Sequence, residues 1–446
     1  MQKSKNSASK YNSLLAEGFE LKPQQVEYID FAMNHHYCMV GAKQGNGKTL
    51  VGIITSQLTG SKTVVVCPSF LRLTWRSEFE KFLKEPPSIV VVTSGKQAKK
   101  IEPSDAEVFI VSYSLLGSCE HLFIGVDSVV LDEAHMILNP KAKRTKSVLS
   151  YINRHIPKRL TMLTGTPNKG KGKQWYSPIM LCSMNPQDTS GVDLRKYHYT
   201  YWDFQKKFCH MQIMRIGGRD VTQFDGIKNV ETLKKLLKDK LIVGKKVDHG
   251  VSLVFKDILV SFKEDKELQS AWESFVSGDK AEEEHMMSIK SRSAMSKVPF
   301  TVDYVSNLIE SGEGPVVVFT DHLNPLYDME REFKKKYEVR VINGATPMDQ
   351  RHRFVEEFQA GGVDVLVATI TSSNTGLTLT KAHNMVMNDL NWNPIENDQA
   401  YHRIFRIGQK EDCVVHNIAG SKTDKVIAKN LLKRQGIIDK VLEEWE

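Results

Sequence analysis

The sequence predicts an α/β protein with two parallel-sheet lobes and helical insertions around the hinge between them. Two observations predict this fold class. Short runs of β-branched and other apolar residues recur in two blocks, near 19–186 and 299–425. Amphipathic helical segments separate the runs, which is typical of parallel strands covered on both faces. A length of 446 residues suits two large domains with insertions.

Each block contains several short, nearly continuous apolar runs. In the first block we expect strands at 37–40, 63–67, 89–92, 108–111, 128–131 and 160–163. In the second block we expect strands at 316–319, 339–342, 363–367, 385–387 and 414–418. Only the first block contains a glycine-rich loop ending in Gly-Lys-Thr. We therefore expect the second lobe to complete a site that the first lobe makes.

These blocks divide the chain into five expected segments. A flexible basic tail at 1–18 precedes the first lobe at 19–186. Mainly helical insertions and the inter-lobe hinge occupy 187–298, the second lobe occupies 299–425, and a C-terminal helix occupies 426–446. The tail is polar and rich in lysine without an apolar core, so no signal peptide is expected.

Composition narrows the class of function. The 61 basic and 53 acidic residues give a net charge of +8, a mild bias toward a polyanionic partner. No apolar run approaches the roughly 18 residues that span a bilayer, so no membrane partner is expected. The six cysteines form no C-x-x-C pair. This pattern argues against a zinc site or a disulfide framework and favours an intracellular, reducing setting.

The stretch AKQGNGKT at 42–49 is the first of two motifs that indicate the chemistry. It follows an apolar run and ends in Gly-Lys-Thr. In such a loop the backbone amides around Gly45 and Gly47 surround a polyphosphate. Lys48 then reaches the β- and γ-oxygens, and Thr49 offers its hydroxyl to Mg²⁺. Taken alone, the triplet can occur by chance.

The second motif, Asp132-Glu133-Ala134-His135, follows the apolar run at 128–131. An acidic pair at the end of a buried strand suits a metal-holding carboxylate, Asp132, and a carboxylate that orients or deprotonates water, Glu133. An exposed acidic turn is the alternative interpretation. Because the motif shares a block with the phosphate loop, the two together predict a nucleoside triphosphatase.

In the second block, the segment QAYHRIFRIGQ at 399–409 carries Arg403 and Arg406. On a helix, residues three apart share one face. A guanidinium that reaches a γ-phosphate from another lobe is an arginine finger, worth about 10³–10⁵-fold in turnover. Two solvated surface arginines are the alternative. Because the second block lacks its own phosphate loop, we favour the arginine finger.

These segments resemble the motif set of superfamily-two helicases, and most closely that of the SWI/SNF-type helicase-like ATPases. The resemblance rests on LKPQQ at 21–25, VVCPS at 65–69, VSY at 111–113, LTGTP at 163–167, INGAT at 342–346, DLNWNP at 389–394 and RIFRIGQ at 403–409. The last two segments are specific to this branch. The resemblance implies two RecA-like lobes with ATP and Mg²⁺ in the cleft between them.

The resemblance also implies roles for individual residues. Gln25 would read the adenine, and other nucleotide contacts are implied at Gly45, Gly47, Lys48, Thr49, His135, Gly376 and Gln399. Catalytic roles are implied for Lys48, Asp132, Glu133, Arg403 and Arg406, with Mg²⁺ held by Thr49 and Asp132. Contacts to DNA, mainly to its phosphates, are implied at Pro68, Ser69, Ser112, Tyr113, Lys141, Lys143, Arg144, Thr320, Asn343, Gly344 and Trp392.

Some segments depart from the family pattern or allow two interpretations. The loop at 371–379 is poor in glycine, and Thr378 stands where the family has asparagine. The Lys- and Gly-rich segment at 168–173 suits either phosphate contacts or a solvated loop. The aromatic residues at 197–202 suit packing of the insertion or base stacking. The segments FQKKFC at 204–209 and GIKN at 226–229 resemble landmarks of the annealing-helicase subfamily, which acts on forks and branched DNA.

We therefore expect an ATP-dependent DNA translocase or helicase that acts on branched DNA in replication, recombination or repair. Its action would be fork remodelling, branch migration or strand annealing. A protein–DNA or chromatin remodelling ATPase and a non-translocating, ATP-gated DNA clamp are the alternatives. The sequence identifies no protein partner. The compact chain favours a bacterial or bacteriophage member, and hence the cytoplasm of a bacterium or phage-infected cell (the nucleus for a eukaryotic one).

Overall fold

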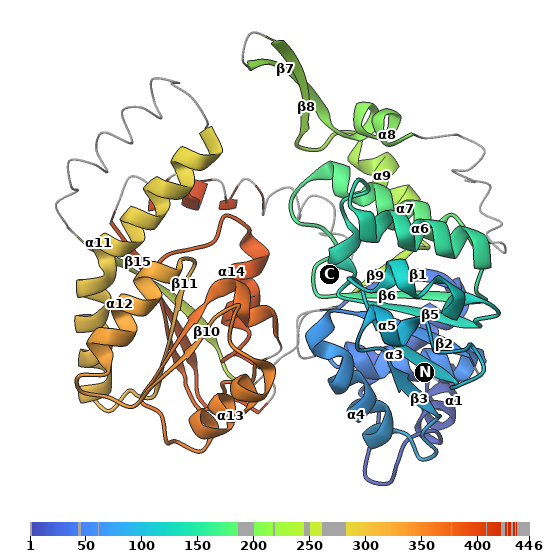
Figure 1. The fold of residues 1–446 in the computed structure, drawn as a ribbon, viewed down its shortest axis with the longest axis horizontal. Helices are drawn as coiled ribbons and strands as arrows, with labels where there is room; N and C mark the ends of the chain where they lie inside the picture. The colour runs from blue at the N-terminus through green and yellow to red at the C-terminus, as the bar shows by residue number, and fades with distance from the viewer. Residues whose placement is uncertain are drawn as a thin grey trace. The chain divides into compact units, whose positions relative to one another are not determined.

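The computed structural model describes residues 2–42, 46–60, 62–185, 200–216, 219–244, 250–260, 282–375, 377–406 and 408–420, with 424–425, 427–429, 431–432 and 434. The chain forms two compact units, Met1–Val247 with Arg434–Glu446, and Asp248–Lys433. Each unit contains one parallel sheet covered by helices (Figure 1). The predicted α/β class with two parallel-sheet lobes is therefore confirmed.

The first unit is built on a seven-stranded sheet in the order β3-β4-β2-β5-β6-β1-β9. All of its pairings are parallel. The strands are β1 (Tyr37–Gly41), β2 (Thr63–Cys67), β3 (Ile89–Val91), β4 (Val108–Ser112), β5 (Ser128–Asp132), β6 (Arg159–Thr164) and β9 (Leu241–Val243). Because the strands are parallel, the loops that follow β1, β2, β4 and β5 meet at one edge of the sheet.

Both faces of this sheet are buried, which explains the continuous apolar runs. Along β2, Val64 and Val66 pack into one core and Val65 packs into the other, as the alternation of a strand requires. One face is covered by α2 (Pro23–His35), α3 (Lys48–Thr59) and α4 (Arg72–Phe82). The other is covered by α6 (Lys143–His155), α7 (Tyr176–Cys182), α8 (Tyr201–Phe208) and α9 (Val230–Leu237), while the short α5 (Gly95–Ala98) follows β3.

The second unit is built on a six-stranded parallel sheet in the order β10-β15-β14-β11-β13-β12. Its strands are β10 (Leu253–Leu259), β11 (Val316–Thr320), β12 (Val339–Ile342), β13 (Val365–Thr369), β14 (Asn384–Met387) and β15 (Cys413–Ala419). Its helices are α11 (Glu282–Glu310), α12 (Leu323–Phe333), α13 (Met348–Gln359) and α14 (Pro394–Tyr401). The central strand β11 is completely buried between two apolar cores.

The segment 187–298 differs from the mainly helical insertion that we expected. Besides helices, it contains the antiparallel ribbon of β7 (His210–Ile216) and β8 (Arg219–Asp225). It also contributes β9 to the first sheet, beside β1, and β10 to the second sheet, beside β15. The first sheet therefore continues past residue 186. The sequence pattern did not reveal β9 because a three-residue strand beside a lysine-rich helix carries little periodicity.

The N-terminal segment is also a correction, because a helix replaces the expected flexible tail. The helix α1 spans Gln2–Asn12, and Tyr11 and Leu15 are buried in the core beneath α2 and α4. The Tyr11 hydroxyl donates to Asp30 Oδ1 over 2.6 Å. These two apolar anchors fix a segment whose average composition is polar. The expected C-terminal helix at 426–446 lies mostly outside the described residues.

Two further expectations concern the environment of the chain. Among the described residues, no helix combines the length and apolarity that a bilayer crossing requires. All six cysteines are buried thiols without a disulfide bond. Burial raises the pKa of Cys38 to about 12. The thiol therefore stays protonated at neutral pH and behaves as a small apolar core residue.

A buried histidine in the second unit leads to a pH-dependent stability prediction. His416 on β15 lies 2.9 Å from the Tyr304 hydroxyl through Nδ1 and 3.0 Å from Asn384 Oδ1 through Nε2. Burial lowers its pKa from 6.5 to about 4. The unfolded chain therefore takes up the proton first as the pH falls. We expect the second unit to lose about 2 kcal/mol of unfolding free energy between pH 7 and pH 5.

The measurement is the urea midpoint of the wild type and of His416→Gln at both pH values. The glutamine keeps hydrogen-bonding capacity but does not titrate. We expect the pH slope to become flatter in the variant, whatever its absolute stability. An unchanged slope would mean that His416 is not the group responsible.

Candidate functional site

The phosphate-type loop joins β1 to α3 at the carboxyl edge of the first sheet. Gly47 precedes α3 with φ = 66°, a conformation that favours glycine. A Cβ atom there would also lie only 2.2 Å from Gln25 Nε2. Lys48 donates from Nζ to the carbonyl of Ala42 over 2.9 Å. Gly45 lies outside the described residues.

Gln25 lies directly against this loop. Its Oε1 accepts from the backbone N–H of Lys22 over 2.8 Å, as in a capping box at the start of α2. Its Nε2 lies 3.4 Å from the carbonyl of Gly47, and the residue is buried. The helix start thus fixes the side chain of the predicted adenine-reading residue beside the phosphate loop.

The geometry around α3 suits a bound polyphosphate. Lys48 and Thr49 are partly exposed in the first turn of a twelve-residue helix, whose N-terminal amides attract anions. Asn46 is buried, and its side-chain amide interacts with the Tyr28 hydroxyl, which opposes the rise that burial causes in the pKa of Tyr28. The amide has further hydrogen-bonding capacity and lies next to Gly47, so Asn46 is a further candidate for ligand contact. Asn46 belongs to the stretch at 42–49, in which the sequence assigned it no role.

Asp132 ends β5 and is held by two donors. Trp75 Nε1 donates to its Oδ2 over 2.8 Å, and the N–H of Glu133 donates to its Oδ1 over 2.9 Å. Burial, followed by the neighbouring charge of Glu133, raises the pKa of Asp132 to about 7. A cation beside Asp132 would favour its ionised form. The carboxylate therefore suits the metal-holding role that we predicted.

Glu133 adopts an unusual backbone conformation next to this carboxylate. Its φ of 49° lies in the left-handed region, which costs a residue with a side chain about 1–2 kcal/mol. Its Oε2 lies 3.0 Å from Nδ1 of His135. Such strain persists where the surrounding structure holds it, and it is frequent at functional sites. The predicted residues Glu133 and His135 are thus brought together.

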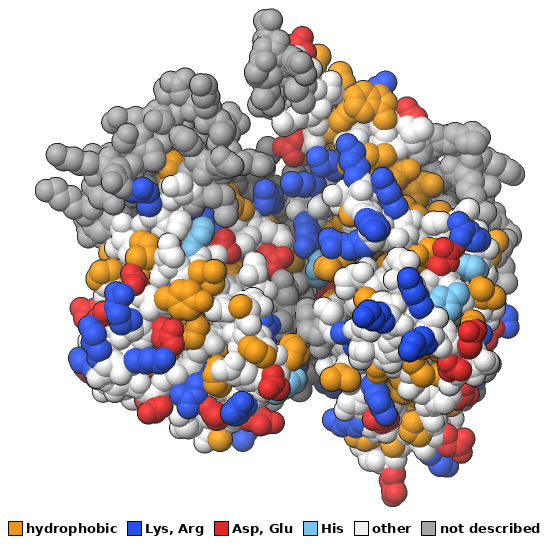
Figure 2. All heavy atoms as spheres, in the orientation of Figure 1, with side chains coloured by type: hydrophobic (Ala, Val, Ile, Leu, Met, Phe, Trp, Pro, Cys, Tyr) orange, Lys and Arg blue, Asp and Glu red, His pale blue; other side chains and the backbone are white. Residues whose placement is uncertain are grey.

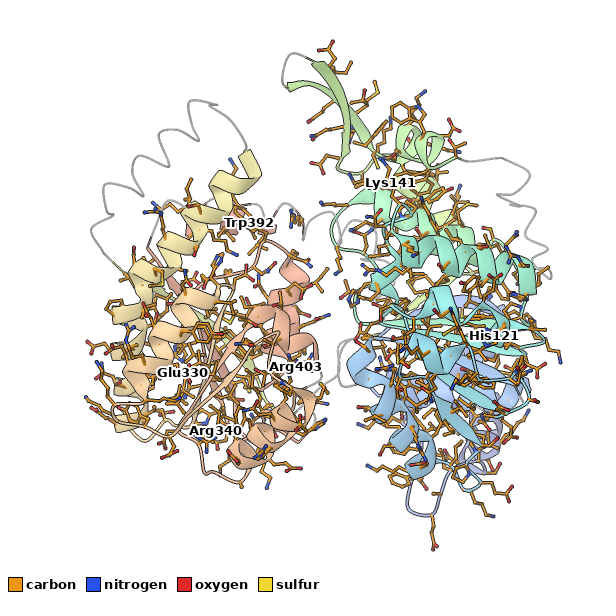
Figure 3. All side chains as sticks on the ribbon, in the orientation of Figure 1. His121, Lys141, Glu330, Arg340, Trp392 and Arg403 are labelled. Carbon is orange, nitrogen blue, oxygen red and sulfur yellow. The ribbon has the colours of Figure 1, made fainter. Side chains whose placement is uncertain are left out.

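A groove of about 620 Å³ lies at the same edge of the sheet. It is lined by the loops after β2 and β4 and by the start of α6, and it contains Pro68, Ser69, Tyr113, Lys143 and Arg144. Lysine and arginine side chains also gather on the surface of this unit (Figure 2). Lys141, just before α6, is exposed (Figure 3). Six of the predicted DNA-contacting residues therefore lie in or close to one basic region.

Ser112 lies deeper than this group. Its side chain is buried at the end of β4, and its hydroxyl lies 3.0 Å from that of Ser114. The last strand residue points into the unit, whereas its neighbour Tyr113 lines the groove. The predicted contact of Ser112 with DNA stays a prediction.

Tyr113 connects the groove to the acidic pair. Its hydroxyl donates to the backbone carbonyl of Asp132 over 2.8 Å. Burial, together with the charge of Asp132, raises the pKa of Tyr113, so the hydroxyl remains a donor. A side chain that lines the groove thus makes direct contact with the residue expected to hold the metal.

In the second unit, Arg403 and Arg406 do not lie on a helix as we expected. The helix α14 ends at Tyr401, and both arginines lie in the turn that follows. They nevertheless converge, because each guanidinium approaches the carbonyl of Leu377, at 3.5 Å and 3.3 Å respectively. Arg406 also donates to Thr378 Oγ1 over 2.9 Å. Thr378, which departs from the family pattern, is therefore a hydrogen-bond acceptor for Arg406.

Two other predicted nucleotide contacts belong to this region. Gln399 is buried in α14, and its Oε1 has no hydrogen-bond partner among the described residues. Gly376 precedes Leu377 and lies outside the described residues. Figure 3 shows Arg403 near one end of α14, away from Trp392, which precedes the helix.

The remaining predicted DNA contacts in this unit form two separate surfaces. Asn343 lines an open pocket of about 560 Å³ beside α12 and α13. Arg351 donates to the carbonyls of Asn343 and Gly344 and so holds this turn, while Gly344 is exposed. Trp392 is partly buried in the turn before α14. The structure therefore does not group Asn343 with Trp392.

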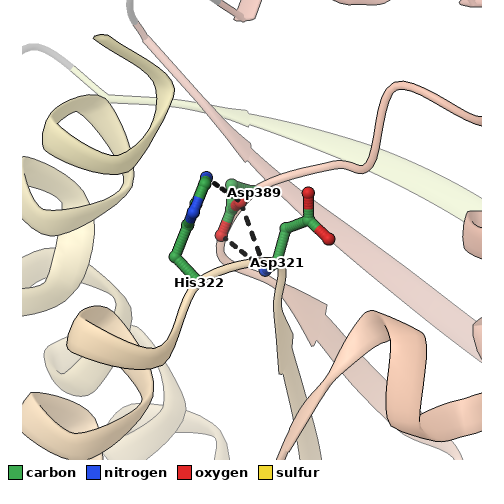
Figure 4. Close-up of side chains that lie close together, drawn as sticks. All are labelled: Asp321, His322 and Asp389. Carbon is green, nitrogen blue, oxygen red and sulfur yellow. Dashed lines mark hydrogen bonds and ion pairs between the residues drawn. The ribbon is translucent and has the colours of Figure 1, made fainter. Parts of the chain in front are cut away.

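Thr320, also predicted to contact DNA, has a fully buried side chain at the end of β11. Its hydroxyl donates to Asp389 Oδ1 over 2.5 Å. Asp389 belongs to a cluster with Asp321 and His322 (Figure 4). The carboxylates accept hydrogen bonds from Thr320, from the N–H of Asp321 and from the Asn391 amide, and Asp321 also pairs with Lys290. Protein donors thus satisfy the two carboxylates of the cluster, which favours a structural role for them over a cation site.

Lys290 provides a stability prediction for this network. Its side chain is only 1% exposed, and its ammonium pairs with Asp321. We expect Lys290→Met to destabilise the second unit by about 3–5 kcal/mol, because it leaves the buried Asp321 carboxylate without its cation. Urea unfolding measures the loss.

The matched control is Lys334→Met, which removes an ion pair with Glu330 at a lysine whose side chain is 56% exposed. We expect a change below about 1 kcal/mol for the control. Equal stability losses in the two variants would contradict the importance that we assign to the buried pair.

Comparisons with known proteins were made for the whole chain. The family model described as SNF2-related domain matches residues 2–248. The model described as helicase conserved C-terminal domain matches residues 301–408. The first match covers more than half of the chain.

Two kinds of relative illustrate the similarity. A Xenopus tropicalis protein named SWI/SNF-related matrix-associated actin-dependent regulator of chromatin subfamily A-like protein 1 is 26% identical over 91% of this chain and 43% of its own length. The human DNA annealing helicase and endonuclease ZRANB3 is 26% identical over 93% of this chain and 40% of its own length. The chain thus spans less than half the length of these relatives.

A solved structure, the Sulfolobus solfataricus SWI2/SNF2 ATPase core in complex with dsDNA, is 18% identical, with a TM-score of 0.44. The match covers 95% of this chain and 96% of that one.

Proposed function

The chain belongs to the family of SNF2-related domains, and from this premise we propose that it is an ATP-dependent motor acting on branched DNA. The observation that carries the proposal is the contact between Tyr113 and Asp132. It connects a residue that lines the basic groove to the backbone of Asp132, at the same sheet edge as the phosphate loop. DNA in the groove can therefore influence hydrolysis.

The nucleotide site is assigned to the first unit. Gln25 would bind the adenine, and Lys48 would leave the carbonyl of Ala42 to contact the β- and γ-phosphates. Asn46 would donate from its buried amide. Thr49 and Asp132 are the residues that would hold Mg²⁺, which supplies charge neutralisation to the phosphates. The assignment rests on the convergence of these groups at one sheet edge.

Hydrolysis is assigned to Glu133 acting on water. Its carboxylate lies beside Asp132 and 3.0 Å from His135 Nδ1, which restricts its orientation. Glu133 would align the attacking water with the γ-phosphorus and accept its proton. Arg403 and Arg406 of the second unit would stabilise the charge on the γ-phosphate. In the structure both guanidiniums already converge near Leu377.

The groove predicts a specific dependence on salt. Phosphate contacts release counterions, so each one makes DNA binding weaker as the salt concentration rises. We expect the double variant Lys143→Ala/Arg144→Ala to bind duplex DNA more weakly at 100 mM salt and to reduce the slope of log K against log salt by about two. Fluorescence anisotropy at several salt concentrations measures this slope.

The control is Lys334→Ala/Lys335→Ala, which removes two exposed lysines on the second unit. Its slope should match that of the wild type. Equal slopes in all three proteins would mean that Lys143 and Arg144 do not contact the DNA phosphates.

Branched DNA is the substrate that we favour. The relatives include proteins named as DNA annealing helicases, and segments of the insertion resemble landmarks of that subfamily. The test is ATP-dependent migration of a synthetic four-way junction, with Glu133→Gln as the inactive control. We expect conversion of the junction into duplex arms. Absence of conversion, with intact ATP hydrolysis, would contradict the branched-DNA role.

Two alternatives have different signatures. Displacement of a triplex-forming strand from duplex DNA requires translocation, so its absence would favour the ATP-gated clamp. Stronger stimulation by nucleosomes than by bare DNA would favour the remodelling ATPase. The second alternative draws on the name of the Xenopus relative, which describes a regulator of chromatin.

A further inference from the structure

The β7–β8 ribbon extends away from the body of the first unit (Figure 1). Near its base the two faces of the ribbon differ in chemistry, because side chains alternate along each strand and paired residues share a face. Further along, the register places Arg215 and Asp220 on the face of Met211, and Met214 and Val221 on the face of Gln212. We define the apolar face by Met211, Ile213, Thr222 and Phe224, which follow from the pairs Met211–Phe224 and Ile213–Thr222. We define the polar face by His210, Gln212, Gln223 and Asp225.

The apolar face is exposed where it leaves the body of the unit. Met211 is 53% exposed and Ile213 is 66% exposed. Phe224, at the base of the ribbon, is buried against the half-exposed ring of Trp202 on α8, with the ring centroids 5.0 Å apart. More than half of the surface of each of these two neighbouring apolar residues is therefore left uncovered by the described part of the first unit. A ligand that accepts apolar contacts is therefore expected.

The base of the ribbon is firmly anchored. Phe204, Phe208 and Ile227 belong to the same core as the sheet. A Cβ atom on Gly172 would lie 2.6 Å from the carbonyl of Gly226, so the Lys- and Gly-rich loop packs closely against the ribbon base. The ribbon is thus held in a defined direction, as a binding surface requires.

The surroundings of the base are basic. The ammonium of Lys206 lies 5.5 Å from the centre of the Trp202 ring. Burial raises the pKa of Cys209 to about 11, while the nearby charges of Lys173 and Lys228 oppose this shift and that of Asp225 adds to it. Lysine and arginine side chains gather on this end of the first unit (Figure 2). Two acidic residues also lie here. Asp225 belongs to the polar face, and the carboxylate of Asp203 on α8 accepts a hydrogen bond from the hydroxyl of Thr200. A polyanion with apolar faces fits this surface better than an acidic or purely apolar protein.

We propose that the apolar face of the β7–β8 ribbon inserts at the branch point of DNA and separates or supports unstacked bases there. This inference rests on the proposed action on DNA. A two-stranded ribbon has the width that the major groove admits. Met and Ile are among the side chains that proteins wedge between base steps. The half-exposed Trp202 ring offers a stacking surface at the base.

The test compares the two faces of the same ribbon. The apolar-face variant is Met211→Ser/Ile213→Ser, and the matched control is Gln212→Ser/Gln223→Ser. All four side chains are exposed, so both variants should fold normally. The probes are a plain duplex, a fork and a four-way junction with 2-aminopurine at the branch. The readouts are anisotropy, 2-aminopurine fluorescence without ATP and duplex-stimulated ATP hydrolysis.

We expect the apolar-face variant to bind the fork and the junction about tenfold to hundredfold more weakly than the wild type and to lose the fluorescence increase at the branch. Its affinity for plain duplex and its duplex-stimulated hydrolysis should stay within about twofold of wild type. The control should behave as wild type throughout.

Three results would overturn the inference. Equal affinities and fluorescence changes in both variants and the wild type on all probes would mean that the apolar face does not contact DNA and instead suits a protein partner. A loss of duplex binding and hydrolysis equal to the loss on forks would indicate a general DNA contact. The same loss on branched DNA in both variants would remove the distinction between the faces. Because the fluorescence readout needs no ATP, it tests the ribbon even if the wild type lacks DNA-stimulated hydrolysis, a result that would instead refute the motor.

Discussion

Glu133→Gln is expected to lower ATP turnover by about 10²–10⁴-fold, because an amide cannot accept the proton of the attacking water. The substitution preserves the size of the side chain and leaves Lys48, Asp132 and the groove in place. Affinities for ATP and DNA should therefore stay close to wild type. Steady-state phosphate release gives the turnover, and equilibrium binding of a fluorescent ATP analogue gives the affinity.

Lys48→Ala tests the predicted phosphate contact in the same assays. It removes the cation expected to contact the phosphates, so we expect nucleotide affinity and turnover to fall together. Glu107→Gln, a change at a carboxylate outside the site that accepts from Ser88, is the control. Normal hydrolysis in either Glu133→Gln or Lys48→Ala would refute the assignment of this edge as the catalytic site.

Arg406→Ala is expected to lower turnover by about 10³-fold or more if its guanidinium stabilises the transferring phosphoryl group. Arg406 donates to Thr378 Oγ1 over 2.9 Å. The Thr378→Ala variant removes only that positioning contact, so we expect a smaller loss that leaves the maximal rate partly intact. Single-turnover hydrolysis at saturating ATP distinguishes these cases.

The control for this series is Arg331→Ala, since Arg331 is a surface arginine paired with Asp328. It should retain full activity and stability. Circular dichroism and urea unfolding establish that Arg406→Ala remains folded. A folded Arg406→Ala protein with wild-type turnover would contradict the arginine-finger assignment and leave Arg403 as the candidate for that role.

The continuous apolar runs in the sequence predicted the strands of the two sheets. Runs such as 64–67 and 316–319 are apolar at every position because both faces are covered, and such runs identify buried parallel strands well. Weak signals failed where a few residues decide the structure. Tyr11 and Leu15 fix an otherwise polar N-terminal segment, and β9 has only three residues.

At the site, motifs located the charged and phosphate-binding residues but not the groups that hold them. Trp75 donates to Asp132 across a large sequence separation, and no local pattern reports such a contact. The convergence of Arg403 and Arg406 comes from a turn after α14, although helical spacing predicted it. The buried positions of Ser112 and Thr320 depend on strand ends, where a shift of one residue reverses the direction of a side chain.

Steady-state ATP hydrolysis without nucleic acid, and then with single-stranded, duplex, forked and four-way-junction DNA at one salt concentration, tests the central claim most directly. The contact between Tyr113 and Asp132 predicts that DNA in the groove stimulates hydrolysis, with forks and junctions as the strongest activators. Equal stimulation by plain duplex would contradict the branched-DNA role. Hydrolysis that no DNA stimulates would contradict the coupling between groove and catalytic site.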